Sequence, residues 1–83
     1  MNYTMTSTPN PNALKFTAEG PLFSNRVEVF KDDQTNSPFL TKLIEIDGVI
    51  SLFGFNDFVT ICKSPDAAWE NLLPHVKETL EKF

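Results

Sequence analysis

Hydrophobic and polar residues alternate with a period of two in several short stretches of the chain. The alternation predicts strands over residues 3–6 and 13–17, and a further short strand over residues 26–30. Residues 8–12 hold two prolines and two asparagines, which favour a rigid turn, so the first two strands are expected to pair as a hairpin. The charged side chains of the third strand suit the edge of a sheet.

Two later segments repeat their apolar residues at helical spacing. Ser37 and Pro38 are expected to open the first helix, and Gly48 to end it in the left-handed conformation that helix ends favour. The second helix is predicted to open at Ser64. Its apolar stripe consists of Trp69, Leu72, Leu73, Val76, Leu80 and Phe83. Pro74 interrupts this stripe, so a kink or a break into two helical pieces is expected there.

The stretch between the two helices predicts a second hairpin. Its strands are expected over residues 49–55 and 58–63, joined by a two-residue turn at Asn56-Asp57 or by a four-residue loop over residues 54–57, which shifts the pairing but keeps the same residues on each face. The length of the turn sets the register of the hairpin. With the two-residue turn, the opposed pairs are Phe55–Phe58, Phe53–Thr60 and Ser51–Cys62.

Alternation sorts the residues of this hairpin into two faces. The first face, expected to carry the helices, consists of Ile50, Leu52, Gly54, Val59 and Ile61. The second face, expected to stay open to water, consists of Ser51, Phe53, Phe55, Phe58, Thr60 and Cys62. Two interpretations of its rings remain open. Either they form a partner-binding surface, or they pack on one another, on Tyr3 or on the N-terminal loop.

The predicted order of elements is strand, strand, short strand, helix, strand, strand, helix. Short hairpins favour a mainly antiparallel sheet, and two helices with one apolar stripe each favour packing on one face of it. We therefore predict an α+β fold, a two-layer domain in which two helices cover one face of a mainly antiparallel sheet. At 83 residues, the chain is expected to form one domain over residues 1–83.

Composition and charge disfavour several classes of function. A net charge of −4 gives little attraction to phosphate backbones, so no nucleic-acid partner is expected. No apolar run approaches the roughly 20 residues that span a bilayer, and the first residues lack the basic start and apolar run of a secretory signal. We therefore expect no membrane partner and a cytoplasmic location, which a single cysteine also fits.

Few side chains offer catalytic or metal-binding chemistry, since the chain holds one Cys and one His. Cys62 would need a base within reach to act as a nucleophile, and nothing in the spacing places His75 beside it. Asp32 and Asp33 have no third acid at the spacing of a calcium loop, and Trp69 is expected in the core. No catalytic, cofactor-binding or metal-binding residue is predicted, and the protein is not expected to be an enzyme.

A family resemblance covers the chain from about residue 4 to residue 83. It rests on the order and spacing of Thr8-Pro9-Asn10-Pro11-Asn12-Ala13-Leu14-Lys15-Phe16, Ser37-Pro38, Ile46-Asp47-Gly48-Val49, Ser51-Leu52-Phe53, Asp57-Phe58-Val59-Thr60-Ile61, and Trp69 with Leu72, Leu73 and Pro74. With these strings the chain resembles the N-terminal domain of the NifU-like (Nfu) iron–sulfur scaffold proteins. In that family a separate C-terminal domain with a C-x-x-C motif holds the cluster. Similar domains occur alone in some bacteria, and this chain is expected to be one that stands without the cluster-binding domain.

The resemblance implies a non-enzymatic protein-interaction module that is accessory to iron–sulfur cluster assembly or delivery, with assembly components as partners. Docking is expected through the residues Thr8, Pro9, Asn10, Pro11, Asn12, Phe53, Phe55, Phe58 and Thr60. Two alternatives stay open. The first is a dimer that carries iron or a cluster directly through Cys62, and the second is a small ligand-binding or regulatory domain unrelated to iron. The sequence leaves the oligomeric state open.

Overall fold

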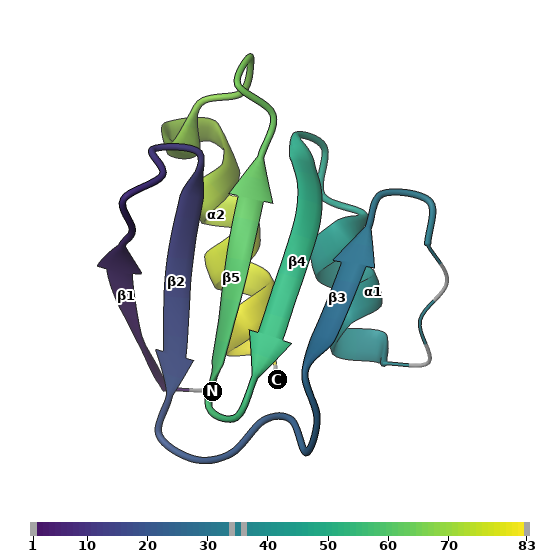
Figure 1. The fold of residues 1–83 in the computed structure, drawn as a ribbon. Coiled ribbons are helices and arrows are strands. Elements are labelled where there is room, and N and C mark those ends of the chain that lie inside the picture. The colour runs from purple at the N-terminus through teal and green to yellow at the C-terminus, as the bar shows by residue number, and fades with distance from the viewer. Residues whose placement is uncertain (1, 34, 36, 83) are drawn as a thin grey trace.

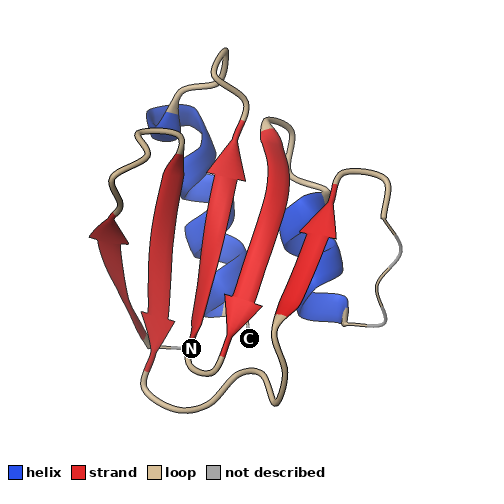
Figure 2. Ribbon diagram, in the orientation of Figure 1, coloured by secondary structure: helices blue, strands red, loops and turns tan. Residues whose placement is uncertain are grey.

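The computed structural model describes residues 2–33, 35 and 37–82. A five-stranded antiparallel sheet forms one layer, and two helices lie on one face of it (Figure 1, Figure 2). In chain order the elements are β1 (Tyr3–Ser7), β2 (Ala13–Ala18), β3 (Val27–Phe30), α1 (Pro38–Ile44), β4 (Val49–Phe55), β5 (Phe58–Lys63) and α2 (Trp69–Glu81). The predicted two-layer α+β fold and the predicted order of elements are confirmed.

The strands lie in the order β1-β2-β5-β4-β3, so the two hairpins join through β2 and β5. β3, which carries the charged residue Glu28, lies at one edge, and β1 lies at the other. Asn56 takes the left-handed backbone that asparagine tolerates in the turn between β4 and β5, with φ 54°. The predicted pairs of this hairpin are confirmed: Phe55–Phe58, Phe53–Thr60 and Ser51–Cys62.

One residue of the hairpin departs from the predicted alternation. Val49 pairs with Lys63 and Ser51 pairs with Cys62, so Ile50 is the extra residue of a β-bulge. The bulge shifts the alternation by one residue, which buries Val49 and leaves Ile50 44% exposed. The prediction that Ile50 lies on the helix-covered face is therefore wrong. The other predicted members of that face are buried: Leu52, Gly54, Val59 and Ile61.

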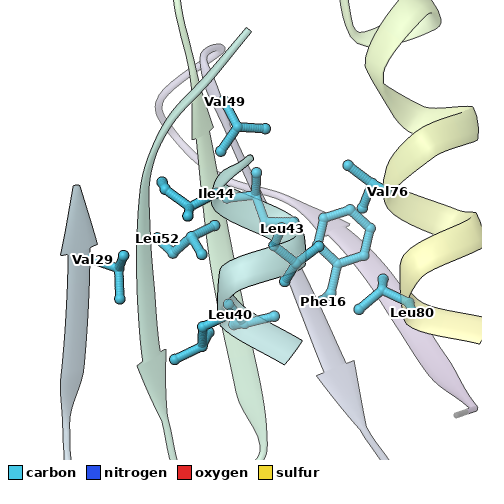
Figure 3. Packing of buried hydrophobic residues seen from close by; sticks show 11 residues of the cluster. Phe16, Val29, Leu40, Leu43, Ile44, Val49, Leu52, Val76 and Leu80 are labelled. Carbon is cyan, nitrogen blue, oxygen red and sulfur yellow. The ribbon is translucent and has the colours of Figure 1, made fainter. Parts of the chain in front are cut away.

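The core lies between the sheet and the two helices (Figure 3). Phe16 of β2 is a fully buried side chain, and Figure 3 shows its ring directed toward Val76 and Leu80 of α2. The remaining core residues come from strands and from α1: Val29, Leu40, Leu43, Ile44, Val49, Leu52, Val59 and Ile61. Because a strand sends alternate side chains to opposite faces, the residues between these core positions lie on the far side of the sheet.

The predicted start of the first helix is confirmed, whereas the predicted end at Gly48 is wrong, because the helix ends at Ile44 and its C-cap, Glu45, has right-handed backbone. The Ser37 hydroxyl accepts a hydrogen bond from the amide of Leu40 at 3.3 Å, and Pro38 is the first residue of α1. A turn after Ile44 leads to Gly48, which has a φ of +100°. A Cβ atom at Gly48 would lie 2.8 Å from Leu72 Cδ2, so the position requires glycine both for its backbone and for the close approach of α2.

The second helix begins later than predicted. Ser64 does not cap this helix. Its hydroxyl accepts a hydrogen bond from the amide of Asp66 at 3.3 Å, in the turn before the helix, and the residue directly before the helix is Ala68, which has extended backbone. Trp69 begins α2, and its Nε1 donates to the Pro11 carbonyl at 3.0 Å. Pro74 lies on an exposed position inside one continuous helix, so α2 is not split into two pieces.

Candidate functional site

The face of the sheet opposite the helices, which we call the open face, is covered by no described helix or strand (Figure 1). Residues that pair across neighbouring strands share a face, so the register of the strands decides which side chains lie on it. Its strand residues, from β1 to β3, are Thr4, Thr6, Ala13, Lys15, Thr17, Phe58, Thr60, Cys62, Ser51, Phe53, Phe55, Glu28 and Phe30.

Three aromatic rings gather on the open face at the end next to the β4–β5 turn. The centroid of the Phe58 ring lies 6.0 Å from that of Phe53 and 6.3 Å from that of Phe55. Lys15 Nζ lies 4.3 Å from the centroid of the Phe58 ring, at the range of a cation–π contact. We call Phe53, Phe55 and Phe58 the phenylalanine cluster, and Thr60 pairs with Phe53 at its border.

Phe53 and Phe55 each contact the Phe58 ring, and the cluster also remains in contact with water. Phe53 and Phe58 are half-buried, and Phe55 is 48% exposed. Tyr3 takes no part in this packing, because its ring lies edge-on against Phe16 on the helix side of the sheet, with the centroids 5.8 Å apart. An exposed group of aromatic rings thus lies on a face that the fold leaves uncovered.

The open face is nearly neutral although the chain is acidic. Lys15 and Glu28 are the charged residues among its described strand positions, and the phenylalanine cluster lies between their strands. Both charged residues belong to one row of residues that pair across neighbouring strands. From β1 to β3 this row consists of Thr6, Lys15, Thr60, Phe53 and Glu28. Since the chain has 7 Lys and Arg against 11 Asp and Glu, its excess negative charge lies away from these positions.

The turn over residues 8–12 is closed by its own hydrogen bonds. Thr8 Oγ1 accepts from the amide of Asn10 at 3.1 Å, and Asn10 Oδ1 accepts from the amide of Asn12 at 2.9 Å. The two prolines, Pro9 and Pro11, are exposed on this turn. The turn therefore presents its prolines on a backbone that its side chains hold in place.

The structure does not bring the 8–12 turn and the phenylalanine cluster together. The turn joins β1 to β2 at one end of the sheet, whereas the cluster flanks the β4–β5 turn at the opposite end (Figure 1). The length of β5, from Phe58 beside the cluster to Lys63 beside the 8–12 turn, separates them by about 17 Å. The two sets of residues expected to bind partners therefore form two separate surfaces.

Lys63 is a buried charged residue that the sequence reasoning missed. It is 7% exposed, and its Nζ donates to Asn12 Oδ1 at 2.9 Å and to the Ser64 carbonyl at 3.3 Å. The same nitrogen lies 5.9 Å from the centroid of the Trp69 ring. Alternation along β5 offered a signal, because Lys63 has the same parity as the buried Ile61. Its contacts tie the 8–12 turn to the end of β5.

The groups singled out for possible chemistry lie apart from one another. Cys62 is half-buried on the open face, whereas His75 is exposed on α2. Asp32 and Asp33 are exposed in the turn after β3, where the Asp33 carboxylate accepts from the amide of Phe30 at 2.9 Å. Within the described residues, no three His, Cys, Asp or Glu side chains gather into a group that could hold a metal ion.

A hollow of about 510 Å³ lies between the α1–β4 turn and the start of α2. Its charged lining residues are Lys31, Asp47 and Asp66. The Lys31 ammonium already donates to the carbonyls of Ile44 and Ile46, at 2.7 Å and 3.0 Å. The hollow therefore holds a structural contact at the end of α1, and it lies at the end of the sheet away from the phenylalanine cluster.

Comparison with known proteins agrees with the family resemblance that the sequence motifs indicated. The family model described as "Scaffold protein Nfu/NifU N terminal" matches residues 3–83. The chain belongs to this family. This Nfu N-terminal domain is 36% identical over 79 residues to NifU-like protein 5, mitochondrial, of Arabidopsis thaliana, a match over 93% of this chain and 29% of that protein. It is also 36% identical over 74 residues to conserved virulence factor C of Staphylococcus aureus, over 84% of this chain and 19% of that protein.

Solved structures share the fold of this Nfu N-terminal domain. The crystal structure of protein SAV1430 from Staphylococcus aureus has a TM-score of 0.85 and 30% identity, over 96% of this chain and 99% of that chain. The solution structure of a NifU-like protein from Saccharomyces cerevisiae has a TM-score of 0.81 and 27% identity, over 98% of this chain and 76% of that one. The chain spans less than a third of the length of the two curated relatives. Of the helices described, none has the length and apolar character needed to cross a membrane.

Proposed function

We propose that this domain is a non-enzymatic protein-interaction module of the cytoplasm that serves iron–sulfur cluster assembly or delivery. The open face is its main contact surface, and the 8–12 turn is a second, separate one. Membership of a scaffold protein family supports the connection with assembly. The phenylalanine cluster, which lies on a sheet face without a covering layer, is the observation that carries the choice of surface.

Burial of the exposed part of these rings supplies the driving force for docking. A phenylalanine offers about 150–250 Å² of surface, and Phe55 leaves 48% of its own in water. Covering that part would contribute about 2 kcal/mol to binding at 25 cal/mol per Å². A soluble domain seldom keeps a group of rings exposed without a contact surface, so a protein partner is the occupant that this face fits.

The test is capture of iron–sulfur assembly components by the purified domain. The wild-type domain and a Phe55→Ser variant serve as baits in a cell lysate, and the bound proteins are identified by mass spectrometry. Met5→Ser is the matched control, because Met5 is exposed to a similar extent, 43%, but its strand position faces the helix side. Wild type and Met5→Ser are expected to recover scaffold or cysteine-desulfurase components, and Phe55→Ser to recover at least about tenfold less.

Equal recovery by Phe55→Ser would place the contact surface elsewhere on the domain. Absence of assembly components from the wild-type capture would contradict the proposed connection with iron–sulfur clusters. Thermal unfolding of all three baits shows whether a loss of binding comes from a loss of fold, and exposed positions are expected to shift stability by only about 0.5 kcal/mol.

A further inference from the structure

We propose that the open face also pairs with a second copy of this chain, in a two-fold symmetric dimer. Its axis lies between the two packed sheets, runs parallel to the strands, and passes over the line that separates β4 from β5. This inference rests on the proposed function, because it names one partner of the same surface. Its support is the position of the two charges of the open face relative to the middle of the phenylalanine cluster.

Lys15 and Glu28 are placed symmetrically about the line between β5 and β4. Their row reads Lys15 on β2, Thr60 on β5, Phe53 on β4 and Glu28 on β3. Each charge therefore lies one and a half strand spacings from that line, about 7 Å to either side. A two-fold axis along the line lays Lys15 of one copy over Glu28 of the other, twice in each dimer.

The same axis pairs the aromatic positions of β4 and β5, whereas β1 extends beyond the partner's β3. Phe55 of one copy faces Phe58 of the other, and Phe53 faces Thr60, so the aromatic rings meet along the axis, at the end of the sheet next to the β4–β5 turn. The charged pairs lie outside them, which is the arrangement of an apolar centre with a polar rim. No charge of the open face is left opposite a like charge.

The distance between packed sheets suits these charged pairs. Two sheets that pack face to face lie about 10 Å apart with their strands at about 30°. That angle displaces Lys15 from the partner's Glu28 by about 4 Å along the strands, which a lysine side chain and a glutamate side chain bridge together. The contact of Lys15 with the Phe58 ring already holds the ammonium on this face.

The size of the open face indicates a weak dimer. The axis pairs four strands, β2, β5, β4 and β3. At about 4.8 Å per strand and a strand length of about 17 Å, they give a flat area of roughly 330 Å² per copy, below the ~800 Å² per partner of a standard interface. Self-association is therefore expected at high micromolar to millimolar concentration, which leaves the face available to a heterologous partner at lower concentration.

Charge reversal tests the pairing without removal of any ring. Lys15→Glu places a carboxylate opposite Glu28, and Glu28→Lys places an ammonium opposite Lys15, so each variant alone is expected to weaken the dimer at least about tenfold. Sedimentation equilibrium from about 20 µM to 1 mM measures the dissociation constants. Glu28→Lys reduces the net charge from −4 to −2 by replacing one negative charge with one positive charge, so simple loss of repulsion would instead strengthen its association.

Mixing the two variants is the decisive arm of this experiment. In a mixed dimer, the carboxylate introduced by Lys15→Glu would face the ammonium introduced by Glu28→Lys, and the unchanged Lys15 and Glu28 would face each other. Association is therefore expected to return to within about threefold of wild type. Recovery by mixing also shows that both variants are folded. A wild-type chain that remains monomeric at 1 mM, stronger association of Glu28→Lys alone, or no recovery in the mixture would each overturn the proposal.

Cys62 gives an independent readout, because it is the single thiol of the chain and lies on the open face. A short bismaleimide is expected to cross-link the wild-type dimer through Cys62. The matched control is a Cys62→Ser, Lys77→Cys double variant, whose thiol lies on an exposed position of α2 and is not expected to cross-link. Equal cross-linking of the two thiols would contradict the proposed face.

Failure of this inference and failure of the proposed function give different results. A monomeric wild-type domain that still captures assembly components in a Phe55-dependent manner would contradict the proposed dimer and leave the proposed function standing. A domain that dimerises, and whose two charge-reversed variants recover association when mixed, but that captures no assembly component, would contradict only the proposed connection with iron–sulfur clusters.

Discussion

The two faces of the sheet use the same kinds of residue for different purposes. On the helix side, Phe16 is 1% exposed among aliphatic side chains from both helices (Figure 3). On the open face, Phe53 and Phe55 each contact Phe58, and no described helix or strand covers the three rings. The eight phenylalanines of the chain therefore do not all fill the hydrophobic core. The face of the sheet, rather than the residue type, decides whether a ring stabilises the fold or remains available for contact.

The lysines on the two faces also differ in burial and in the contacts of their ammonium groups. Lys15 on the open face keeps its ammonium over the Phe58 ring at a partly exposed position. Lys63 on the helix side is buried, and two oxygen acceptors and the Trp69 ring surround its ammonium. A buried ammonium requires such acceptors because it has lost its water, whereas a partly exposed one does not.

The largest difference between the faces is expected for truncation of an aromatic ring. Phe16→Ala is expected to reduce the free energy of unfolding by about 3–5 kcal/mol, because it leaves a cavity in the core. Phe55→Ala, on the open face, is expected to change it by less than about 1 kcal/mol. Urea unfolding of both variants measures the difference. Similar losses for the two would show that the open face is part of the core.

A methyl group added to the helix side of β4 is expected to give the next largest effect. The Cβ atom of a Gly54→Ala variant would lie 2.6 Å from two carbons of the Phe23 ring, which packs against this glycine. Thermal unfolding is expected to show a loss of about 1–3 kcal/mol from this overpacking. Gly20→Ala is the control, since no atom lies within 4 Å of its added Cβ, and it is expected to be neutral or slightly stabilising. A neutral Gly54→Ala would mean that Phe23 moves aside freely.

Removal of the ammonium from each lysine is expected to give the smallest difference. Lys63→Met leaves Asn12 Oδ1 without its donor and is expected to lower the free energy of unfolding by about 1–2 kcal/mol. Lys15→Met retains an apolar chain beside Phe58 and is expected to lower it by less than about 0.5 kcal/mol. Chemical denaturation compares the two variants with wild type, and a larger loss for Lys15→Met would reverse the assignment of the faces.

Much of this division between faces could be predicted from local signals. Both loop lengths considered for the β4–β5 hairpin put Phe53 and Phe58 on the same face, and the structure has the two-residue turn at Asn56-Asp57 that pairs Phe55 with Phe58. The Ser37 cap and Pro38 likewise mark the start of α1, because both act within the first turn of the helix. The end of α1 at Ile44 was not predicted, since Gly48 lies beyond it and is in part required by the approach of α2.

The features that were missed depend on contacts between distant segments. The bulge at Ile50 belongs to the pairing of β4 with β5, and nothing in the alternation of β4 alone reveals it. The start of α2 at Trp69 coincides with a hydrogen bond to the Pro11 carbonyl, 58 residues earlier. The separation of the 8–12 turn from the phenylalanine cluster follows from the antiparallel pairing of β2 with β5, which joins two distant segments of the chain.

The measurement that tests the division of roles most directly is the free energy of unfolding of a Phe53→Ser variant, taken together with its binding. Phe53 is half-buried at the centre of the open face, between Thr60 and Glu28. The account predicts a loss of about 1–2 kcal/mol, with capture of assembly components and self-association both reduced at least about tenfold. A loss of about 3–5 kcal/mol, as for a fully buried phenylalanine, with binding retained by the folded fraction would contradict it.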